Sequence, residues 1–113
     1  AVLYVSDTGR GLGGRRHHVF AFDADPRGGL SRRRVFAVIE PGRADGMAVD
    51  EHGRLWAATD ASVQVFAPDG RLVGGVPLPE KGSNCCFGGD DGATLFVTAG
   101  GSLYAVETAA RGA

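Results

Sequence analysis

The stretch Ala44-Asp45-Gly46-Met47-Ala48-Val49-Asp50 places a carboxylate directly before a short apolar run. The turn Glu51-His52-Gly53 follows, and a second apolar run occupies Arg54-Leu55-Trp56-Ala57-Ala58. Short apolar runs separated by glycine-containing turns are typical of β-hairpins. The stretch therefore predicts two neighbouring strands, with Asp45 at the start of the leading one.

The second of these strands belongs to a repeat. A leucine followed by an aromatic residue and then small residues occurs at Leu3-Tyr4, Leu55-Trp56 and Leu95-Phe96. The three leucines lie 52 and 40 residues apart, and the shorter spacing matches a four-stranded blade of a β-propeller, which takes about 40–45 residues. The Gly/Arg-rich insert Gly9–Arg16 accounts for the longer spacing. Because no helix-period segment of useful length occurs, the sequence predicts an all-β chain.

The predicted strands divide residues 1–113 into one complete blade and two incomplete ones, with strands named A to D from the axis to the rim. Residues 45–80 form the complete blade, with strands Gly46–Val49, Leu55–Ala58, Val63–Ala67 and Leu72–Val76. Residues 1–40 supply strands B to D of an earlier blade, at Val2–Ser6, His18–Asp23 and Arg34–Ile39. Residues 83–107 supply strands A to C of the last blade, at Asn84–Phe87, Leu95–Thr98 and Leu103–Val106. We therefore expect a partial β-propeller of about two and a half blades.

The chain begins at Ala1 without an initiator methionine and leads straight into a strand. We interpret it as a fragment whose upstream part is missing. Half a propeller leaves open sheet edges with unpaired backbone groups. The 113 residues alone are therefore expected to be unstable or to associate.

Strands that alternate in direction put the connections between blades and the B–C turns at one end of the propeller, called here the first rim. The opposite rim carries ordinary hairpin turns, of which Pro68-Asp69-Gly70 is the clearest, because proline presets φ and glycine supplies a positive φ. Functional sites of propellers lie around the central channel. The first rim collects the polar residues that could perform chemistry, namely Asp7, Thr8, Arg43, Asp45, Asp60, Asn84 and the insert Gly9–Arg16.

Several polar residues near this rim have structural interpretations. Asp7 and Asp60 end strands, and we expect them to make side-chain-to-backbone bonds between blades. The pair His17-His18 is expected to be exposed on a strand, because no cysteine or third histidine lies nearby. Gly11–Gly14 is not a dinucleotide fingerprint, because no helix pattern follows it. Arg10, Arg15 or Arg16 could instead lie near an anionic product at the pocket mouth.

The two cysteines, Cys85 and Cys86, are adjacent. Neighbours in a strand point to opposite faces, so a mutual disulfide is not expected. We interpret both cysteines as small, buried apolar residues. We assign Trp56 to the core between blades. Free thiols favour a reduced, intracellular protein, and a cytoplasmic location is expected.

Composition narrows the range of partners. Twelve basic residues against 13 acidic ones give a net charge of -1, which offers no electrostatic reason to expect nucleic acid or an anionic membrane. No apolar run approaches the roughly 20 residues of a membrane span. The sequence therefore favours a small-molecule partner and leaves the oligomeric state open.

Three motifs resemble those of the SMP-30/gluconolactonase/LRE-like (regucalcin-type) family of six-bladed β-propellers. They are Asp45-Gly46-Met47-Ala48-Val49-Asp50 with the strand after it, the turn Val65-Phe66-Ala67-Pro68-Asp69-Gly70, and Asn84-Cys85-Cys86-Phe87-Gly88-Gly89. Leu3-Tyr4-Val5-Ser6-Asp7-Thr8 fits the preceding blade. The resemblance covers nearly the whole chain and implies that it is the C-terminal half of such a propeller.

The resemblance implies one divalent metal on the axis, held by a Glu, an Asn and the Asp that is Asp45 here. The other two ligands are absent from this chain, so we do not expect it to hold the metal alone. An oxygen site favours Ca²⁺, with Mn²⁺, Mg²⁺ or Zn²⁺ as alternatives. Asp45 is the candidate metal ligand and general base; the alternative is an Asp-Gly turn residue. Asn84 either binds substrate or satisfies a backbone group at a strand start.

The function implied is metal-dependent hydrolysis of a sugar lactone, in which the metal polarises the carbonyl and activates water. Two alternatives remain open at this point. One is a hydrolase of another lactone or a phosphoester on the same scaffold. The other is a non-catalytic propeller that binds proteins or sugars.

Overall fold

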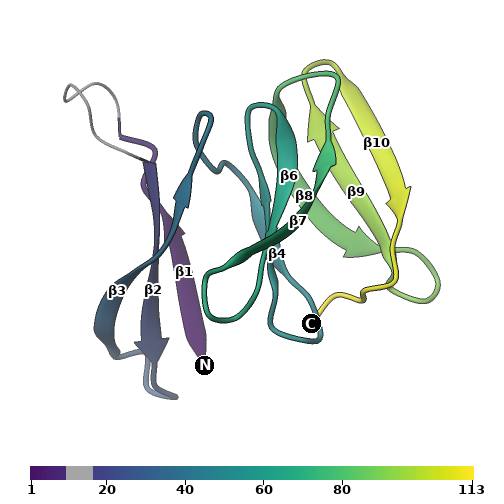
Figure 1. The fold of residues 1–113 in the computed structure, drawn as a ribbon. Coiled ribbons are helices and arrows are strands. Elements are labelled where there is room, and N and C mark those ends of the chain that lie inside the picture. The colour runs from purple at the N-terminus through teal and green to yellow at the C-terminus, as the bar shows by residue number, and fades with distance from the viewer. Residues whose placement is uncertain (10–16) are drawn as a thin grey trace.

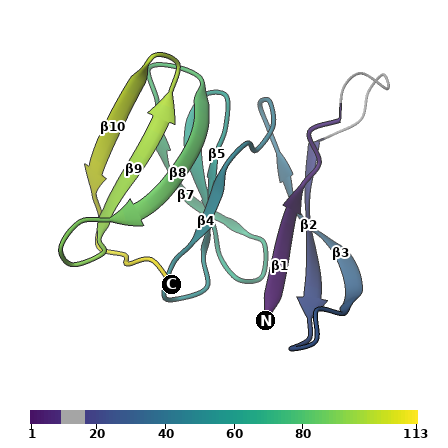
Figure 2. The same cartoon turned by 180° about the vertical axis from the view of Figure 1, so that it is seen from behind.

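A computed structural model describes residues 1–9 and 17–113 and shows three antiparallel β-sheets side by side (Figure 1). The N-terminal sheet contains β1 (Val2–Ser6), β2 (His17–Ala24) and β3 (Leu30–Ile39). The central sheet contains β4 (Met47–Val49), β5 (Leu55–Ala58), β6 (Ser62–Phe66) and β7 (Leu72–Pro77). The C-terminal sheet contains β8 (Gly82–Gly88), β9 (Thr94–Ala99) and β10 (Ser102–Glu107). Seen from behind, the central sheet again lies between the other two (Figure 2).

The predicted all-β propeller fold is confirmed. Each sheet is a meander in which strands that follow one another in sequence are hydrogen-bonded neighbours. The largest difference from the predicted strands is at β3, which begins at Leu30 rather than Arg34. Pairing of Ala24 with Leu30 extends this hairpin, and register shifts near Phe20 and Asp23 let the longer strand follow its neighbour. Such irregularities depend on the paired strand, which is why the local pattern missed them.

The central sheet is covered on both faces, and β5 shows why. Its side chains alternate in direction, and all four are buried. Leu55 and Ala57 pack with Val19 and Ile39 of the N-terminal sheet. Burial on two sides explains why β5 reads as a continuous apolar run rather than an alternating one.

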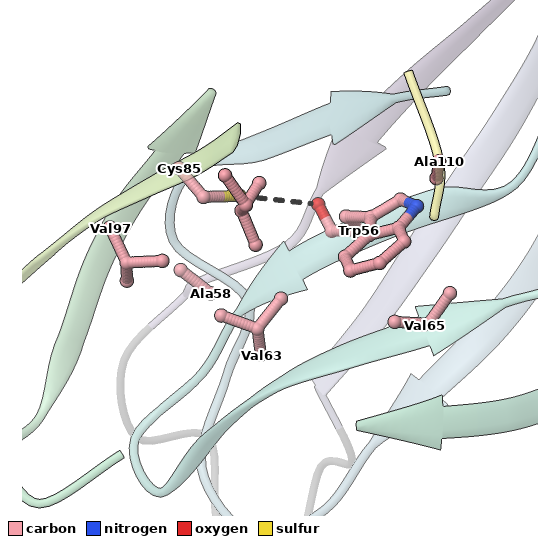
Figure 3. Close-up of a cluster of buried hydrophobic side chains, with 8 residues drawn as sticks. Trp56, Ala58, Val63, Val65, Cys85, Val97 and Ala110 are labelled. Carbon is pink, nitrogen blue, oxygen red and sulfur yellow. Dashed lines mark hydrogen bonds between the residues drawn. The ribbon is translucent and has the colours of Figure 1, made fainter. Parts of the chain in front are cut away.

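The other face of β5 packs against the C-terminal sheet (Figure 3). Trp56 and Ala58 contact a cluster that includes Cys85, Leu95 and Val97. The Trp56 ring meets the Phe87 ring edge-on, with centroids 5.2 Å apart. The predicted place of Trp56 in the core between blades is therefore confirmed.

The hairpin turn at Pro68-Asp69-Gly70 adopts the predicted geometry. Gly70 has φ of 90°, and its N–H donates to the carbonyl of Ala67 at 2.9 Å. The Asp69 carboxylate accepts from the N–H of Arg71 at 2.9 Å. Local turn chemistry is sufficient to define this connection.

The interpretation of both cysteines as buried residues is wrong for one of them. Cys85 and Cys86 are both free thiols, but only Cys85 is buried. The Cys85 thiol lies 3.5 Å from the carbonyl oxygen of Trp56, as the dashed line in Figure 3 shows. Because alternate residues face opposite sides of β8, Cys86 lies on the side turned away from the central sheet.

We expect Cys85 to resist alkylation in the native protein. Burial raises the pKa of its thiol to about 11, and the thiolate is the reactive species. Iodoacetamide labelling followed by peptide mass spectrometry should modify Cys85 only after unfolding in urea. The exposed Cys86 provides the internal control, because it should be labelled in the native protein. Equal labelling rates for the two native thiols would contradict this packing.

No helix among residues 1–9 and 17–113 is long and apolar enough to cross a membrane.

Candidate functional site on the first rim

Connections from all three sheets lie at the same end of the molecule, the first rim, at the top of Figure 1. The Ser6 hydroxyl at the end of β1 donates to the carbonyl of Ala44 before β4 at 2.5 Å. The N–H of Gly82 donates to the carbonyl of Thr59 at 3.0 Å. These bonds connect each sheet to the next at this end of the molecule, so the rim is a continuous surface rather than separate turns.

Asp45 is exposed on this surface, two residues before β4. Its backbone N–H donates to the carbonyl of Ala58 at 2.9 Å, which fixes the residue against the end of β5. Among the described residues, its carboxylate accepts no hydrogen bond and forms no ion pair. The backbone of Asp45 is thus fixed, while its charged oxygens are available to a ligand.

Asn84 of β8 lies beside the residue that follows Asp45. The N–H of Gly46 donates to the carbonyl of Ser83 at 2.8 Å. A methyl group in place of the Gly46 hydrogen would lie 1.8 Å from the Asn84 amide oxygen and 2.6 Å from its Cα. Only glycine allows this approach, and it brings the two candidate site residues from separate sheets to adjacent positions.

The amide oxygen of Asn84 accepts a hydrogen bond from the backbone N–H of Cys85 at 2.9 Å. This is the backbone-satisfying role that the sequence offered as one of its alternatives. Asn84 also lines a hollow of about 130 Å³ with Cys86, Phe96, Thr98 and Leu103. That hollow lies on the outer face of the C-terminal sheet.

Replacing Gly46 with alanine is expected to destabilise the protein by about 1–3 kcal/mol, the usual cost of overpacking. The added methyl group would overlap backbone as well as side-chain atoms of Asn84. Urea unfolding followed by fluorescence of the single tryptophan measures this change. Gly74→Ala is the matched control, because nothing lies within 4 Å of a methyl group there. Equal stability of the two variants would contradict the close approach of β4 and β8.

Among residues 1–9 and 17–113, Asp7 and Asp60 do not make the predicted side-chain-to-backbone bonds between blades. Asp7 accepts from the N–H of Gly9 at 2.9 Å, within its own loop, because a short side chain reaches its own turn first. Asp60 instead forms an ion pair with Lys81 at 3.8 Å. The neutral side chain of Gln64 makes such a bond, donating to the carbonyl of Glu40 at 2.9 Å.

The interpretation of both histidines as exposed strand residues also needs correction. His17 is half-buried, and its Nδ1 lies 2.8 Å from the carbonyl oxygen of Gly42. Since a carbonyl only accepts, Nδ1 carries the proton. The proposed role of Arg10, Arg15 and Arg16 at a pocket mouth lies outside the described residues.

Asp50 is a buried carboxylate whose importance the sequence did not reveal. One oxygen accepts from the backbone N–H groups of His52 at 2.9 Å and Arg54 at 3.0 Å. The other accepts from Arg54 Nε at 2.7 Å and Trp56 Nε1 at 2.9 Å. Burial opposes ionisation and is the largest single influence, but these four bonds together hold the pKa of Asp50 below its ordinary value. The sequence did contain a signal for this role. Asp50 directly precedes a turn, and Arg54 and Trp56, whose side chains carry N–H donors, follow that turn.

Asp50 also lies where the end of the chain returns to the central sheet. It forms a bridge with Gly112, and the N–H of Glu51 donates to the carbonyl of Arg111 at 2.7 Å. This contact lies at the end of the molecule opposite the first rim (Figure 2). Asp50 therefore organises the fold and is not a candidate for chemistry at the first rim.

The oxygen donors at the first rim suit a hard cation but do not complete a site. The Asp45 carboxylate has no partner among residues 1–9 and 17–113, and carboxylate oxygens are preferred ligands of Ca²⁺. Ca²⁺ takes six to eight oxygen ligands, however, and the described residues contain no group of three or more His, Cys, Asp or Glu side chains that could hold a metal. Residues 1–9 and 17–113 therefore do not by themselves bring together such a group of metal-binding side chains.

Comparison with known proteins gives consistent matches. A family model described as the SMP-30/gluconolactonase/LRE-like region matches residues 1–101. A gluconolactonase of Zymomonas mobilis subsp. mobilis is 40% identical over 83 residues, covering 68% of this chain and 22% of that protein. The solved structure of a gluconolactonase from Xanthomonas campestris superposes with a TM-score of 0.80 at 37% identity, covering 94% of this chain and 33% of that one.

A third similar protein is a calcium-binding regucalcin from Agrobacterium tumefaciens, with a TM-score of 0.74 and 21% identity. The match covers 85% of this chain and 40% of that one. At this identity the likeness concerns the fold alone. The chain spans less than half the length of each of these three proteins.

Proposed function

Because the chain belongs to the SMP-30/gluconolactonase/LRE-like family, we propose that it contributes the Asp45 side of a metal-dependent site that hydrolyses sugar lactones. Two of the similar proteins described above are gluconolactonases. The observation that carries the proposal is the Asp45 carboxylate, which is fixed through its backbone at the first rim and has no partner among the described residues.

Asp45 has two roles in this proposal. Its carboxylate is one ligand of a divalent cation, with Ca²⁺ as the first choice and Mn²⁺, Mg²⁺ or Zn²⁺ as alternatives. The cation, when bound, polarises the lactone carbonyl and lowers the pKa of water. The same carboxylate accepts a proton from the attacking water. The water oxygen bonds to the carbonyl carbon, the ring C–O bond breaks, and the ring oxygen leaves protonated as a hydroxyl group.

Asn84 is assigned to the substrate. Its amide oxygen is engaged by the N–H of Cys85, so the amide N–H₂ group is the part available to donate to a sugar hydroxyl. The close approach of Gly46 fixes Asn84 next to Asp45, and a fixed donor recognises a hydroxyl better than a mobile one. Asn84 thus orients the lactone relative to the carboxylate.

A chimaera tests this proposal. Residues 1–113 would replace the segment that they match in the Zymomonas gluconolactonase, and hydrolysis of glucono-lactone would be followed by acid release. We expect the chimaera to be active, to lose activity with a chelator, and to regain it with added Ca²⁺. A folded, metal-loaded chimaera without lactonase activity would favour the binding-module alternative instead.

A further inference from the structure

The connection between the central and C-terminal sheets, residues 78–81, is called here the crossover. It joins β7 to β8 and makes backbone hydrogen bonds to turns of other strand pairs. The N–H of Leu78 donates to the carbonyl of Ala61, between β5 and β6, at 3.0 Å. The carbonyl of Lys81 accepts from the N–H of Gly100, between β9 and β10, at 2.9 Å. The path of the crossover is therefore set by the two turns that it passes.

The crossover leads directly into Asn84. The register of β8 on β9 shifts between Gly82 and Asn84, which makes Ser83 the extra residue of a bulge. Bulges re-aim a side chain next to an active site, and they interrupt the ladder of hydrogen bonds. The direction of Asn84 therefore depends on where the crossover places the start of β8.

Glu80 connects the crossover to the C-terminal sheet. One of its carboxylate oxygens accepts from the N–H of Gly101 at 3.3 Å, and the other accepts from the hydroxyl of Tyr104. The hydroxyl of Ser102 also bonds to this carboxylate. Tyr104 packs against the core between the central and C-terminal sheets, so its hydroxyl is held in place. Hydrogen bonds to an ionised acceptor are stronger than those between neutral groups.

Gly100 shows how closely Glu80 lies on the turn between β9 and β10. Gly100 has φ of 55°, a conformation that glycine adopts more readily than other residues. A methyl group on Gly100 would lie 2.5 Å from a Glu80 carboxylate oxygen and 3.1 Å from the Glu80 Cβ. The side chain of Glu80 thus packs directly on the backbone of this turn.

The central sheet holds the end of the crossover through its backbone. The N–H of Gly82 donates to the carbonyl of Thr59 at 3.0 Å, and a methyl group on Gly82 would lie 2.6 Å from that oxygen. Lys81 adds an ion pair with Asp60 at 3.8 Å, but these side chains are 62% and 39% exposed, and surface pairs of this kind contribute little. Of the two charged side chains in the crossover, Glu80 therefore makes the stronger contacts.

We propose that Glu80 is a positioning residue for the lactone, because it holds the crossover on the C-terminal sheet and thereby sets the direction of Asn84. This inference rests on the proposed function, which assigns the Asn84 amide to a sugar hydroxyl. Asp45 depends less on Glu80, since its N–H is bonded to Ala58 of β5. Loss of the Glu80 contacts should therefore weaken substrate binding more than it slows the metal-dependent step.

Glu80→Gln in the chimaera described above separates these two effects. Glutamine keeps the length of the side chain but has one acceptor oxygen in place of two. We expect KM for glucono-lactone to rise about three- to tenfold, the equivalent of one hydrogen bond. We expect kcat at saturating Ca²⁺ to change by less than about twofold, as it does when binding alone is weakened. A fall in kcat at unchanged KM overturns the proposal.

Two further variants test whether the effect comes from the Glu80 contacts. Lys81→Gln is the matched control, because it removes the neighbouring charge of the same crossover and should leave KM unchanged. Tyr104→Phe removes a hydroxyl that donates to Glu80, so adding Glu80→Gln to it should raise KM less than Glu80→Gln does alone. An equal rise in Lys81→Gln, or full additivity of Tyr104→Phe and Glu80→Gln, overturns the proposal.

Asn84→Ala distinguishes failure of this inference from failure of the proposed function. If Asn84→Ala raises KM and Glu80→Gln does not, Asn84 binds the lactone and the positioning role of Glu80 is overturned. If Asn84→Ala leaves KM unchanged, or the folded chimaera has no lactonase activity, it is the proposed function that fails.

Hydrogen exchange then decides whether Glu80 sets the direction of Asn84. The N–H of Cys85 donates to the Asn84 amide oxygen at 2.9 Å, so its exchange rate reports on that side chain whether or not the chimaera is active. We expect Glu80→Gln to speed exchange of this N–H by at least about threefold and Lys81→Gln to leave it unchanged. Unchanged exchange in Glu80→Gln overturns the proposal.

Discussion

Replacing Asp45 with asparagine in the Zymomonas chimaera is expected to reduce lactone hydrolysis at limiting Ca²⁺ on the order of 100-fold or more, because even residues behind the metal ligands change affinity or activity by 10–100-fold. Asparagine keeps the shape of the side chain and removes its charge. The backbone bond from Asp45 to Ala58 does not involve the side chain, so the fold should be unaffected. Initial rates over a range of Ca²⁺ concentrations measure the effect.

The calcium series separates the two roles assigned to Asp45. If the carboxylate is only a ligand, saturating Ca²⁺ restores the rate of Asp45→Asn. If it also accepts a proton, the rate remains low at saturation, because an amide is not a base at neutral pH. Asp60→Asn is the matched control, because Asp60 is a carboxylate of the same rim that forms an ion pair with Lys81. Wild-type activity and wild-type calcium dependence in Asp45→Asn would refute the site.

Replacing Asp50 with alanine is expected to lower the free energy of unfolding by about 3 kcal/mol. Removal of one member of a buried ion pair costs about 3–5 kcal/mol, and the half-buried position of Arg54 reduces that figure. The change leaves the buried indole N–H of Trp56 and two backbone N–H groups without their acceptor. Urea unfolding followed by tryptophan fluorescence reports directly on this site, since Trp56 is the only tryptophan.

Asp69→Ala is the control for Asp50→Ala. Asp69 also belongs to a hairpin turn, but it is exposed and accepts a single bond from the N–H of Arg71. Its removal should cost less than about 1 kcal/mol. Similar losses for both variants would show that Asp50 contributes no more than an ordinary turn residue.

The contribution of Asp50 to stability should also depend on pH. Its pKa is lowered in the folded protein, so its stabilising effect is complete above the ordinary value of about 3.9 and is lost as pH falls through the folded value. We expect the stability difference between wild type and Asp50→Asn to be constant from about pH 7 to 5 and to narrow below about pH 4. A difference that stayed constant down to acidic pH would contradict ionisation of Asp50 in the folded state.

Local sequence patterns predicted the strands and their order because their causes are local. The alternation of apolar residues and the turn at Pro68-Asp69-Gly70 depend only on neighbours in the chain. The same is true of the position of Asp45 just before the leading strand of its sheet. The family resemblance then supplied the metal and the reaction, which no local pattern contains, and both remain proposals for this chain.

The sequence by itself determined that the chain is all-β, roughly where its strands lie, and that Asp45 stands at the first rim. Only the tertiary structure decided that Gly46 approaches Asn84, that Asp50 is a buried acceptor of four hydrogen bonds, and that Cys85 is buried while Cys86 is exposed. The physical reason is the separation along the chain between the residues that interact. Strand periodicity follows from the geometry of one chain segment, whereas burial and close approach depend on which sheet lies on each side of a residue.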